Sequence, residues 1–147
     1  MKILIINGPN LNLLGQRQPH IYGRESWASY YDLLCQCMSR ATLSCMQSNS
    51  EGEIIDALHS AAYGTDLERV DGVVLNAGAY THYSYAIADA IEALDIPVIE
   101  VHISQPAARE EFRRKSVIAP VCKASVSGFG LDSYFLAIEG LLRNYQR

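Results

Sequence analysis

A glutamate and a histidine stand two residues apart in the apolar segment 98–103, which reads VIEVHI. Side chains alternate between the two faces of a strand, so Glu100 and His102 share one face with Val98. A buried carboxylate is costly unless it is hydrogen-bonded, and a negative charge beside an imidazole favours the protonated ring. His102 is therefore a candidate general acid held by Glu100, although a satisfied core pair without catalysis explains the same spacing equally well.

A long segment without strand or helix periodicity, residues 6–23, carries Arg17 and Tyr22. A tyrosine has an ordinary pKa of about 10 and is normally no base at neutral pH. An arginine about 5 Å away would favour tyrosinate by roughly 3 kcal/mol, whereas desolvation would oppose it. Tyr22 is a candidate base if the charge outweighs the desolvation, and an incidental aromatic in an exposed loop is the alternative. Gly15 and Gly23 are candidate hinges of the loop 16–24, which we expect to be mobile without ligand and to close over it.

Apolar patterns predict the elements that must position these side chains. Strand-like runs cover residues 3–6, 73–75, 98–103 and 122–126, with a weaker run at 43–47. Helical periodicities cover 27–38, 54–62, 87–94 and 131–142, and a short helix over 105–114 would complete the alternation. Repeated right-handed crossovers predict an α/β fold, a flavodoxin-like three-layer sandwich with a five-stranded parallel sheet.

Composition narrows the class of protein. The 147 residues suit one domain, 1–147, and the shares of 49% apolar and 19% charged residues are typical of a globular chain. A formal charge of −4 argues against a nucleic-acid binder. The four cysteines lack paired CxxC spacing and are predicted to be buried thiols. We see neither a signal peptide nor an apolar run of about twenty residues, which predicts no membrane partner and a cytoplasmic location.

Polar side chains follow three of the predicted strands. Asn10 follows the first strand, Asn76 and His82 the third, and Ser104 the fourth. Each stretch taken singly is more often an ordinary turn, and the charged run 109–116 is more often a solvated helix face. In an open parallel sheet, however, ligands bind beyond the carboxyl ends of the strands. Convergence at one edge of the sheet therefore favours a binding site.

Three long segments match one family: INGPNLNLLGQRQPHIYG, NAGAYTHYSYAIADA and EVHISQPAAREEFRR. Together they resemble the type II 3-dehydroquinate dehydratases, and the resemblance extends over essentially the whole chain. It implies a flavodoxin-like fold and an anti elimination of water from 3-dehydroquinate, through an enolate, to 3-dehydroshikimate, with no cofactor and no metal. A stepwise elimination of this kind requires a base, an enolate stabiliser and an acid around one bound ring.

The resemblance also implies roles for individual residues. By similarity, Tyr22 removes the proton next to the ketone, Arg17 favours tyrosinate, Asn10 holds the water that stabilises the enolate, and His102 protonates the departing hydroxyl, oriented by neighbours such as Glu100. The same similarity implies that Asn76, His82 and Arg113 hold the ring hydroxyls, and that Ile103 and Ser104 contact the substrate carboxylate.

Family members form trimers that assemble into dodecamers, so the resemblance implies a homododecamer built as a tetramer of trimers. Asp89 matches an aspartate that reaches toward a neighbouring subunit's site. This sequence departs from many relatives beside that position, with Ala88 in place of an arginine. Tyr83 and Tyr85 also replace smaller residues, so the trimer contact is where this chain differs most clearly from the family pattern.

Three rival interpretations are weaker. The first is a flavodoxin-like nucleotide or flavin binder without dehydratase activity. The sequence contains no GxxxxGK motif, and the GFG at 128–130 lacks the third glycine of a dinucleotide fingerprint. A non-enzymatic interaction module would use the acidic surface instead. The unrelated type I dehydratases use a Schiff-base lysine, and Lys2, Lys115 and Lys123 stand at no convincing strand end.

Overall fold

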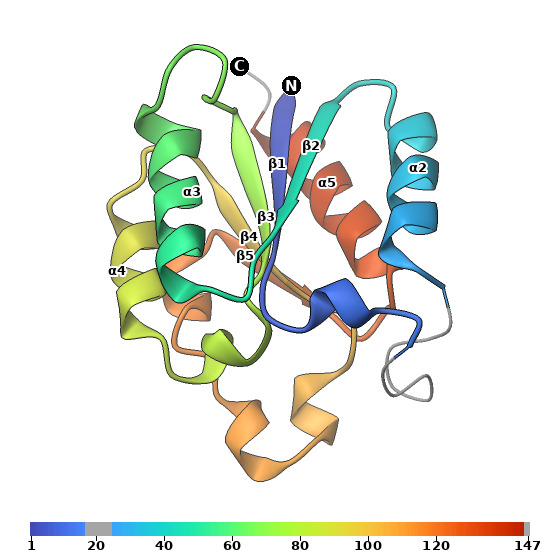
Figure 1. Cartoon of the computed structure of the whole chain (residues 1–147), viewed down its shortest axis with the longest axis vertical. Coiled ribbons are helices and arrows are strands. Elements are labelled where there is room, and N and C mark those ends of the chain that lie inside the picture. The colour runs from blue at the N-terminus through green and yellow to red at the C-terminus, as the bar shows by residue number, and fades with distance from the viewer. Residues whose placement is uncertain (17–24, 146–147) are drawn as a thin grey trace.

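Five strands form one parallel sheet in the order β2-β1-β3-β4-β5, as Figure 1 shows. They are β1 (Lys2–Asn7), β2 (Thr42–Gln47), β3 (Gly72–Asn76), β4 (Val98–His102) and β5 (Ala124–Ser127). The computed structural model describes residues 1–16 and 25–145. The chain moves from β1 to β2 on one side and then to β3 on the other, so strand order reverses at β1. A crevice is expected at such a reversal, beyond the carboxyl ends of the strands.

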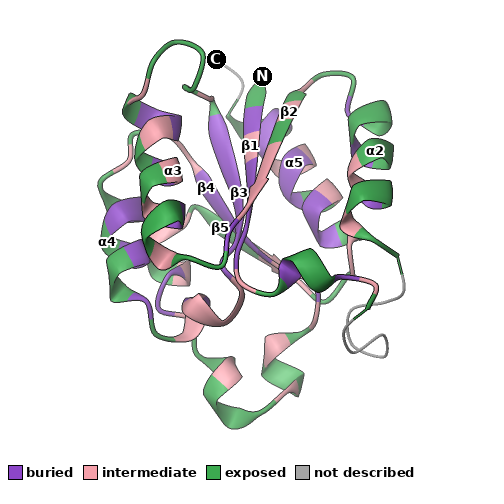
Figure 2. Ribbon diagram, viewed as in Figure 1, coloured by how far each residue is buried: buried purple, intermediate pink, exposed green. Residues whose placement is uncertain are grey.

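In the described part of the chain, four α-helices cover the two faces of the sheet and confirm the three-layer prediction (Figure 1). On one face lie α2 (Trp27–Cys37) and α5 (Asp132–Asn144), and on the other α3 (Glu51–Tyr63) and α4 (Tyr85–Glu92). The central strands β1, β3 and β4 are largely buried, whereas the edge strands β2 and β5 contain no buried residue (Figure 2). No helix in residues 1–16 or 25–145 is both long and apolar enough to cross a membrane.

Serines begin three of the helices. The side chain of Ser26 accepts a hydrogen bond from the backbone N–H of Ser29. In the same way, Ser50 accepts from the N–H of Glu53, and Ser84 accepts from the N–H of Ile87. Such N-caps satisfy a backbone donor that the first helical turn leaves without a partner. These short-range hydrogen bonds explain why α2, α3 and α4 begin where they do.

Alternation along β4 is as predicted. Ile99 and Val101 lie in the core under α2 and α5, whereas Val98 lies in the core under α3 and α4. Glu100 therefore lies on the α3 and α4 face, in the same direction as Val98. It is 2% exposed, so the sheet holds a carboxylate inside its core.

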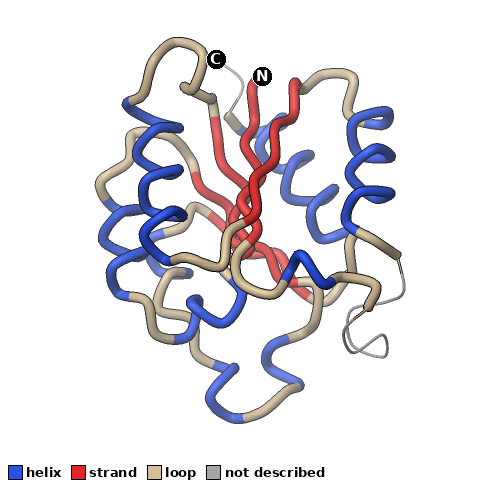
Figure 3. Tube along the Cα trace, viewed as in Figure 1, coloured by secondary structure: helices blue, strands red, loops and turns tan. Residues whose placement is uncertain are grey.

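The predicted single helix over 105–114 is wrong. The segment forms two separate 3-10 turns, η3 (Pro106–Ala108) and η4 (Glu111–Arg114), which protrude at the lower end of the molecule in Figure 3. Arg109 between them has an extended backbone with φ −103° and ψ −161°, which a continuous helix cannot contain. The arginines of this segment are therefore carried on turns rather than along one helix face.

The fifth strand also begins later than predicted. Cys122 follows a third 3-10 turn, η5 (Ala119–Val121), and its N–H bonds to the carbonyl of Ile118 at 3.2 Å. This bond occupies the backbone donor in a local turn, and strand pairing of β5 starts at Ala124.

The prediction that the cysteines are buried is wrong as well. Cys35 and Cys37 are exposed, and Cys45 and Cys122 are half-buried. In α2 the buried residues are Tyr30 and Leu34, and both exposed cysteines belong to the same helix. The apolar character of cysteine alone did not indicate which side of α2 faces the core.

Candidate active site

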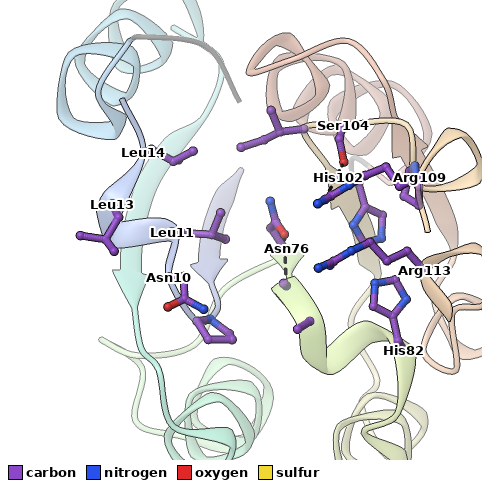
Figure 4. A pocket seen from close by; sticks show the side chains of 15 residues that line it. Asn10, Leu11, Leu13, Leu14, Asn76, His82, His102, Ser104, Arg109 and Arg113 are labelled. Carbon is purple, nitrogen blue, oxygen red and sulfur yellow. Dashed lines mark hydrogen bonds between the residues drawn. The ribbon is translucent and has the colours of Figure 1, made fainter. Parts of the chain in front are cut away.

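A pocket opens at the carboxyl ends of β1, β3 and β4, where the sequence predicted one. Seven of the predicted site residues line it: Asn10, Asn76, His82, His102, Ile103, Ser104 and Arg113. Figure 4 shows Asn10 with three leucines of the β1 loop on one side of the pocket and the histidines and arginines on the other, with Asn76 between them. The predicted convergence of three strand ends is therefore confirmed as geometry.

The remaining predicted residues stand elsewhere. Glu100 lies behind His102 and does not line the pocket. Asp89 is exposed on α4 and is not part of the lining. Arg17 and Tyr22, with the predicted closure of the loop 16–24, lie outside the described residues.

Glu100 is held by hydrogen bonds from His102 on its own strand and from three other segments of the chain. His102 Nε2 lies 2.9 Å from Glu100 Oε1, which also accepts hydrogen bonds from the hydroxyls of Ser116, at 2.7 Å, and Thr81. Ser125 Oγ donates to the other carboxylate oxygen at 2.7 Å. The predicted contact between Glu100 and His102 is confirmed, and sequence reasoning missed the three hydroxyls.

These contacts decide the charge of Glu100. Burial alone would raise the pKa of its carboxyl, but the hydrogen bond and charge of His102, with the bonds from Thr81 and Ser116, lower that pKa to about 2. The carboxylate is therefore ionised at neutral pH. Because Nε2 of His102 is engaged by this anion, the ring is fixed in orientation and its Nδ1 remains for the pocket.

His82, unlike the ionised Glu100, is neutral at neutral pH. Its Nδ1 lies 2.7 Å from the carbonyl oxygen of Lys115, so Nδ1 carries a hydrogen and donates it. Burial lowers the pKa of His82, and the nearby His102 and Arg113 lower it further against the opposing effect of the Lys115 carbonyl. A neutral His82 offers Nε2 as a hydrogen-bond acceptor, which suits a ligand hydroxyl.

Two arginines from the turns after β4 give the pocket positive charge. Arg113 Nε lies 3.0 Å from a carboxylate oxygen of Glu110, and its guanidinium stacks over the ring of Phe112 at 4.7 Å. Arg109, which the sequence analysis did not single out, also lines the pocket, and its Nη1 lies 3.5 Å from Ser104 Oγ. Arg109 stands four residues before Arg113, and this spacing was the signal that could have identified it. The charged run 109–116 was instead interpreted as a solvated helix face.

Asn10 is positioned by the turn that leaves β1. It adopts a left-handed backbone with φ 67°, and its N–H bonds to Asn49 Oδ1 at 3.0 Å. Gln47 Nε2 donates to the same oxygen at 3.0 Å and so holds Asn49 in place. Gly8 is required before the turn because a Cβ there would lie 2.7 Å from the backbone of Ala77. The strands on either side of β1 thus shape this turn.

Asn76 is held from both ends of its carboxamide. Its Nδ2 donates to the hydroxyl of Tyr134 at 2.8 Å, and its Oδ1 accepts from the N–H of Gly78 at 3.2 Å. The second bond is visible in Figure 4. Tyr134 comes from α5, far along the chain, and no local signal in the sequence connects it to Asn76.

The pocket therefore offers two cationic arginines, two imidazoles and amide groups around an opening beside leucines. Such a set fits a small organic anion that carries hydroxyl groups. Among the residues that the structure describes, no three His, Cys, Asp or Glu side chains are grouped as metal ligands.

Comparisons with known proteins agree with this chemistry. The family described as dehydroquinase class II matches residues 1–142. A 3-dehydroquinate dehydratase from Caldicellulosiruptor saccharolyticus is 53% identical over 142 residues, covering 95% of each chain. Crystal structures of type II dehydroquinases from Butyrivibrio crossotus and Propionibacterium acnes are 47% and 39% identical, each covering 97% of both chains with a TM-score of 0.89. On this similarity and on the geometry of its pocket, the chain belongs to the dehydroquinase class II family.

Proposed function

We propose that this chain is a 3-dehydroquinate dehydratase that removes water from 3-dehydroquinate to give 3-dehydroshikimate. Family membership supports the reaction, since curated relatives at about half identity are 3-dehydroquinate dehydratases. One observation carries the proposal in the structure: His102 faces the pocket with Glu100 2.9 Å behind it. A buried anion behind an imidazole is the arrangement that a general acid needs.

The acid step belongs to His102. As the C–O bond of the substrate breaks, its hydroxyl takes a proton from the imidazolium and leaves as water. Glu100 Oε1, 2.9 Å from Nε2 of His102, keeps the ring from turning. Three hydroxyls hold Glu100 in turn, so the acid is supported by residues that do not touch the substrate.

The base step and the enolate belong to the other side of the pocket. Tyr22 takes the proton from the carbon next to the ketone, and Arg17 favours its tyrosinate form. Asn10 holds a water that stabilises the developing enolate oxygen, and it lies across the pocket from His102 in Figure 4. An anti elimination needs base and acid on opposite faces of the ring, and the position of Asn10 supports that division.

The substrate is held by the remaining polar residues. Asn76, His82 and Arg113 bind the ring hydroxyls, and a neutral His82 with Nε2 as acceptor suits that role. The backbone of Ile103 and the hydroxyl of Ser104 bind the carboxylate. Arg109 stands 3.5 Å from Ser104 Oγ and adds positive charge to this subsite.

The test is a turnover assay on the purified chain. We expect 3-dehydroquinate to yield a product with new conjugated-enone absorbance, with and without a chelator, because no step of the proposal uses a metal. Tyr22→Phe should abolish turnover while preserving binding. His102→Ala should lower kcat by about a hundredfold or more, which is the usual contribution of a positioned acid.

His59→Ala is the matched control, since His59 is exposed on α3 and absent from the pocket lining. Its turnover should equal that of the wild type. A wild-type chain without turnover at high enzyme concentration would refute the proposed function, and loss of activity with chelator would refute the metal-free mechanism.

The assembly is a separate part of the proposal. We expect trimers that associate into a homododecamer, with Asp89 reaching the site of a neighbouring subunit. Exposure of Asp89 on α4, beside the 60% and 64% exposed Tyr83 and Tyr85, leaves that surface available for a second copy of the chain. Light scattering on the purified protein measures the assembly, and a monomeric mass would contradict it. A cytoplasmic location stays a prediction.

A further inference from the structure

Behind Asn76 lies a line of buried polar groups that the proposed reaction does not use. Tyr134 is 0% exposed, and its hydroxyl oxygen accepts from Asn76 Nδ2 at 2.8 Å. The same hydroxyl donates to Asn7 Oδ1 at 2.7 Å. Asn7 ends β1 and Asn76 ends β3, and the two are paired neighbours in the sheet. One hydroxyl from α5 thus connects the two strand ends beneath the pocket.

The hydrogen bonds in this line run in one direction. The backbone N–H of Gly78 can only donate, so the atom of Asn76 that faces it must be Oδ1. Asn76 Nδ2 then faces Tyr134, and the tyrosine hydroxyl must accept there and donate onward to Asn7. A carboxamide flipped by half a turn would place two donors against each other at Gly78. The line therefore determines which end of the Asn76 amide faces which way.

We propose that Tyr134 is a positioning residue for substrate binding, which holds the Asn76 carboxamide so that its free N–H and the second lone pair of Oδ1 face a ring hydroxyl. This inference rests on the proposed function, because it requires Asn76 to bind the substrate. Tyr134 itself does not line the pocket and acts only through Asn76.

The surroundings of Tyr134 suit a fixed donor. Burial raises the pKa of Tyr134 above its ordinary value, and the bond from Asn76 offsets only part of that effect. The hydroxyl therefore keeps its proton and remains able to donate to Asn7. Trp27 packs on the Tyr134 ring at 4.7 Å and limits its movement.

Asn7 provides the acceptor that the Tyr134 hydroxyl requires. Its Nδ2 is buried and has no hydrogen-bond partner in the described part of the chain, which is an unfavourable state for an amide. An apolar residue would avoid that cost but would leave the Tyr134 hydroxyl without its acceptor. The unpaired amide group is thus the consequence of supplying Oδ1 to Tyr134.

Tyr134→Phe tests the proposal because it removes only the hydroxyl and keeps the ring. We expect KM for 3-dehydroquinate to rise about three- to tenfold, as for the loss of a well-oriented hydrogen bond, with kcat within about twofold of the wild type. Tyr30→Phe is the matched control. Tyr30 is buried in the same core, but its hydroxyl donates to Asp132 at 3.0 Å and Asp132 does not line the pocket. Its KM and kcat should equal those of the wild type.

A double variant separates positioning from general stability. If Tyr134 acts through Asn76, Asn76→Ala with Tyr134→Phe should have the same KM as Asn76→Ala alone. Additive effects on KM, or an unchanged KM in Tyr134→Phe with a lowered melting temperature, would overturn the proposal. Should Tyr134→Phe fail to fold, Asn7→Ala removes the acceptor and should raise KM in the same direction by a smaller factor; an unchanged KM there also overturns it. A wild-type chain without turnover would instead refute the proposed function itself.

Discussion

Two buried polar clusters lie beneath the same pocket on opposite faces of the sheet. The carboxylate cluster consists of Glu100 with its donors Thr81, Ser116, Ser125 and His102. The amide cluster consists of Asn7, Tyr134 and Asn76. The first lies behind the acid and the second behind a substrate-binding amide. Each supports one pocket residue from the core, but by different means.

The difference between the clusters is charge. Burying an ion is tolerated only when its lone pairs are satisfied, and Glu100 receives four donors. A neutral amide costs less to bury, and the amide cluster retains one unpaired group, Asn7 Nδ2, within the described residues. We therefore expect changes in the carboxylate cluster to affect kcat and acid stability, and changes in the amide cluster to affect KM.

The largest effect is expected from Glu100→Gln. Three donors face Oε1 and would keep a neutral acceptor, but each loses the strength of a bond to a charge, about 1 kcal/mol apiece. We expect a loss of about 3 kcal/mol in urea unfolding and a fall in kcat of about a hundredfold. Glu51→Gln is the control, because Glu51 accepts from Ser84, the N-cap of α4, and neither residue lines the pocket. Equal effects of the two variants would contradict a special role for Glu100.

Asn7→Asp places a carboxylate in the amide cluster, which lacks the hydrogen-bond donors that a buried carboxylate needs. Tyr134 supplies one hydrogen bond there, and the other position of the side-chain group, now Nδ2, has no hydrogen-bond partner among the described residues. Desolvation should therefore raise the pKa of the new carboxyl, the reverse of Glu100. Stability should be lower than the wild type by roughly 2–3 kcal/mol at pH 7, and the deficit should shrink as the pH falls toward 4. Urea unfolding at the two pH values measures this, and a deficit independent of pH would show that charge is not the cause.

Acid unfolding of the wild type tests whether the charge of Glu100 stabilises the fold. The pKa of Glu100 is lowered from 4.5 to about 2 in the folded chain, so the unfolded state binds more protons between these values. The stabilisation is complete above pH 4.5 and is lost as the pH falls through 2, by up to about 3 kcal/mol. Glu100→Gln lacks this titration, and its stability should vary less over the window. Parallel curves for the two proteins would refute the assignment.

The smallest effect is expected from Ser125→Ala. It removes the one donor that the described residues place on Glu100 Oε2, leaving that oxygen buried without a partner. We expect a loss of about 1–2 kcal/mol and a modest decrease in kcat. Ser127→Ala, two residues along the same strand and bonded to Gln105 instead, should change stability by less than about 0.5 kcal/mol. If both serines behave alike, completeness of the donor set around Glu100 does not matter.

Short-range patterns predicted much of this molecule. Alternation along β4 placed Glu100 beside His102, and the order of strands and helices predicted the sheet and its pocket edge. Both depend on periods of two or about four residues that can be counted along the chain. The wrong elements are those in which such counting is ambiguous: two 3-10 turns replace the helix over 105–114, and the exposure of Cys35 and Cys37 depends on how α2 rotates against the core.

The hydrogen-bond partners of the site residues could not be predicted from short-range patterns. Ser116 and Ser125 reach Glu100 from 16 and 25 residues away, and Tyr134 reaches Asn76 from 58. A serine or a buried tyrosine at these positions has no local pattern that distinguishes it from many others in the chain. Arg109 was missed because its charge was interpreted without knowing that a turn directs it into the pocket.

The sequence by itself determined the alternation of strands and helices, the strand ends that carry polar side chains and the resemblance to a single family. Only the tertiary structure decided which hydroxyls hold Glu100 ionised and how the Asn76 amide is oriented. The reason is physical: backbone periodicity is a property of neighbouring residues, whereas the charge of a buried carboxylate and the direction of a buried amide depend on donors and acceptors that meet only when distant segments pack together.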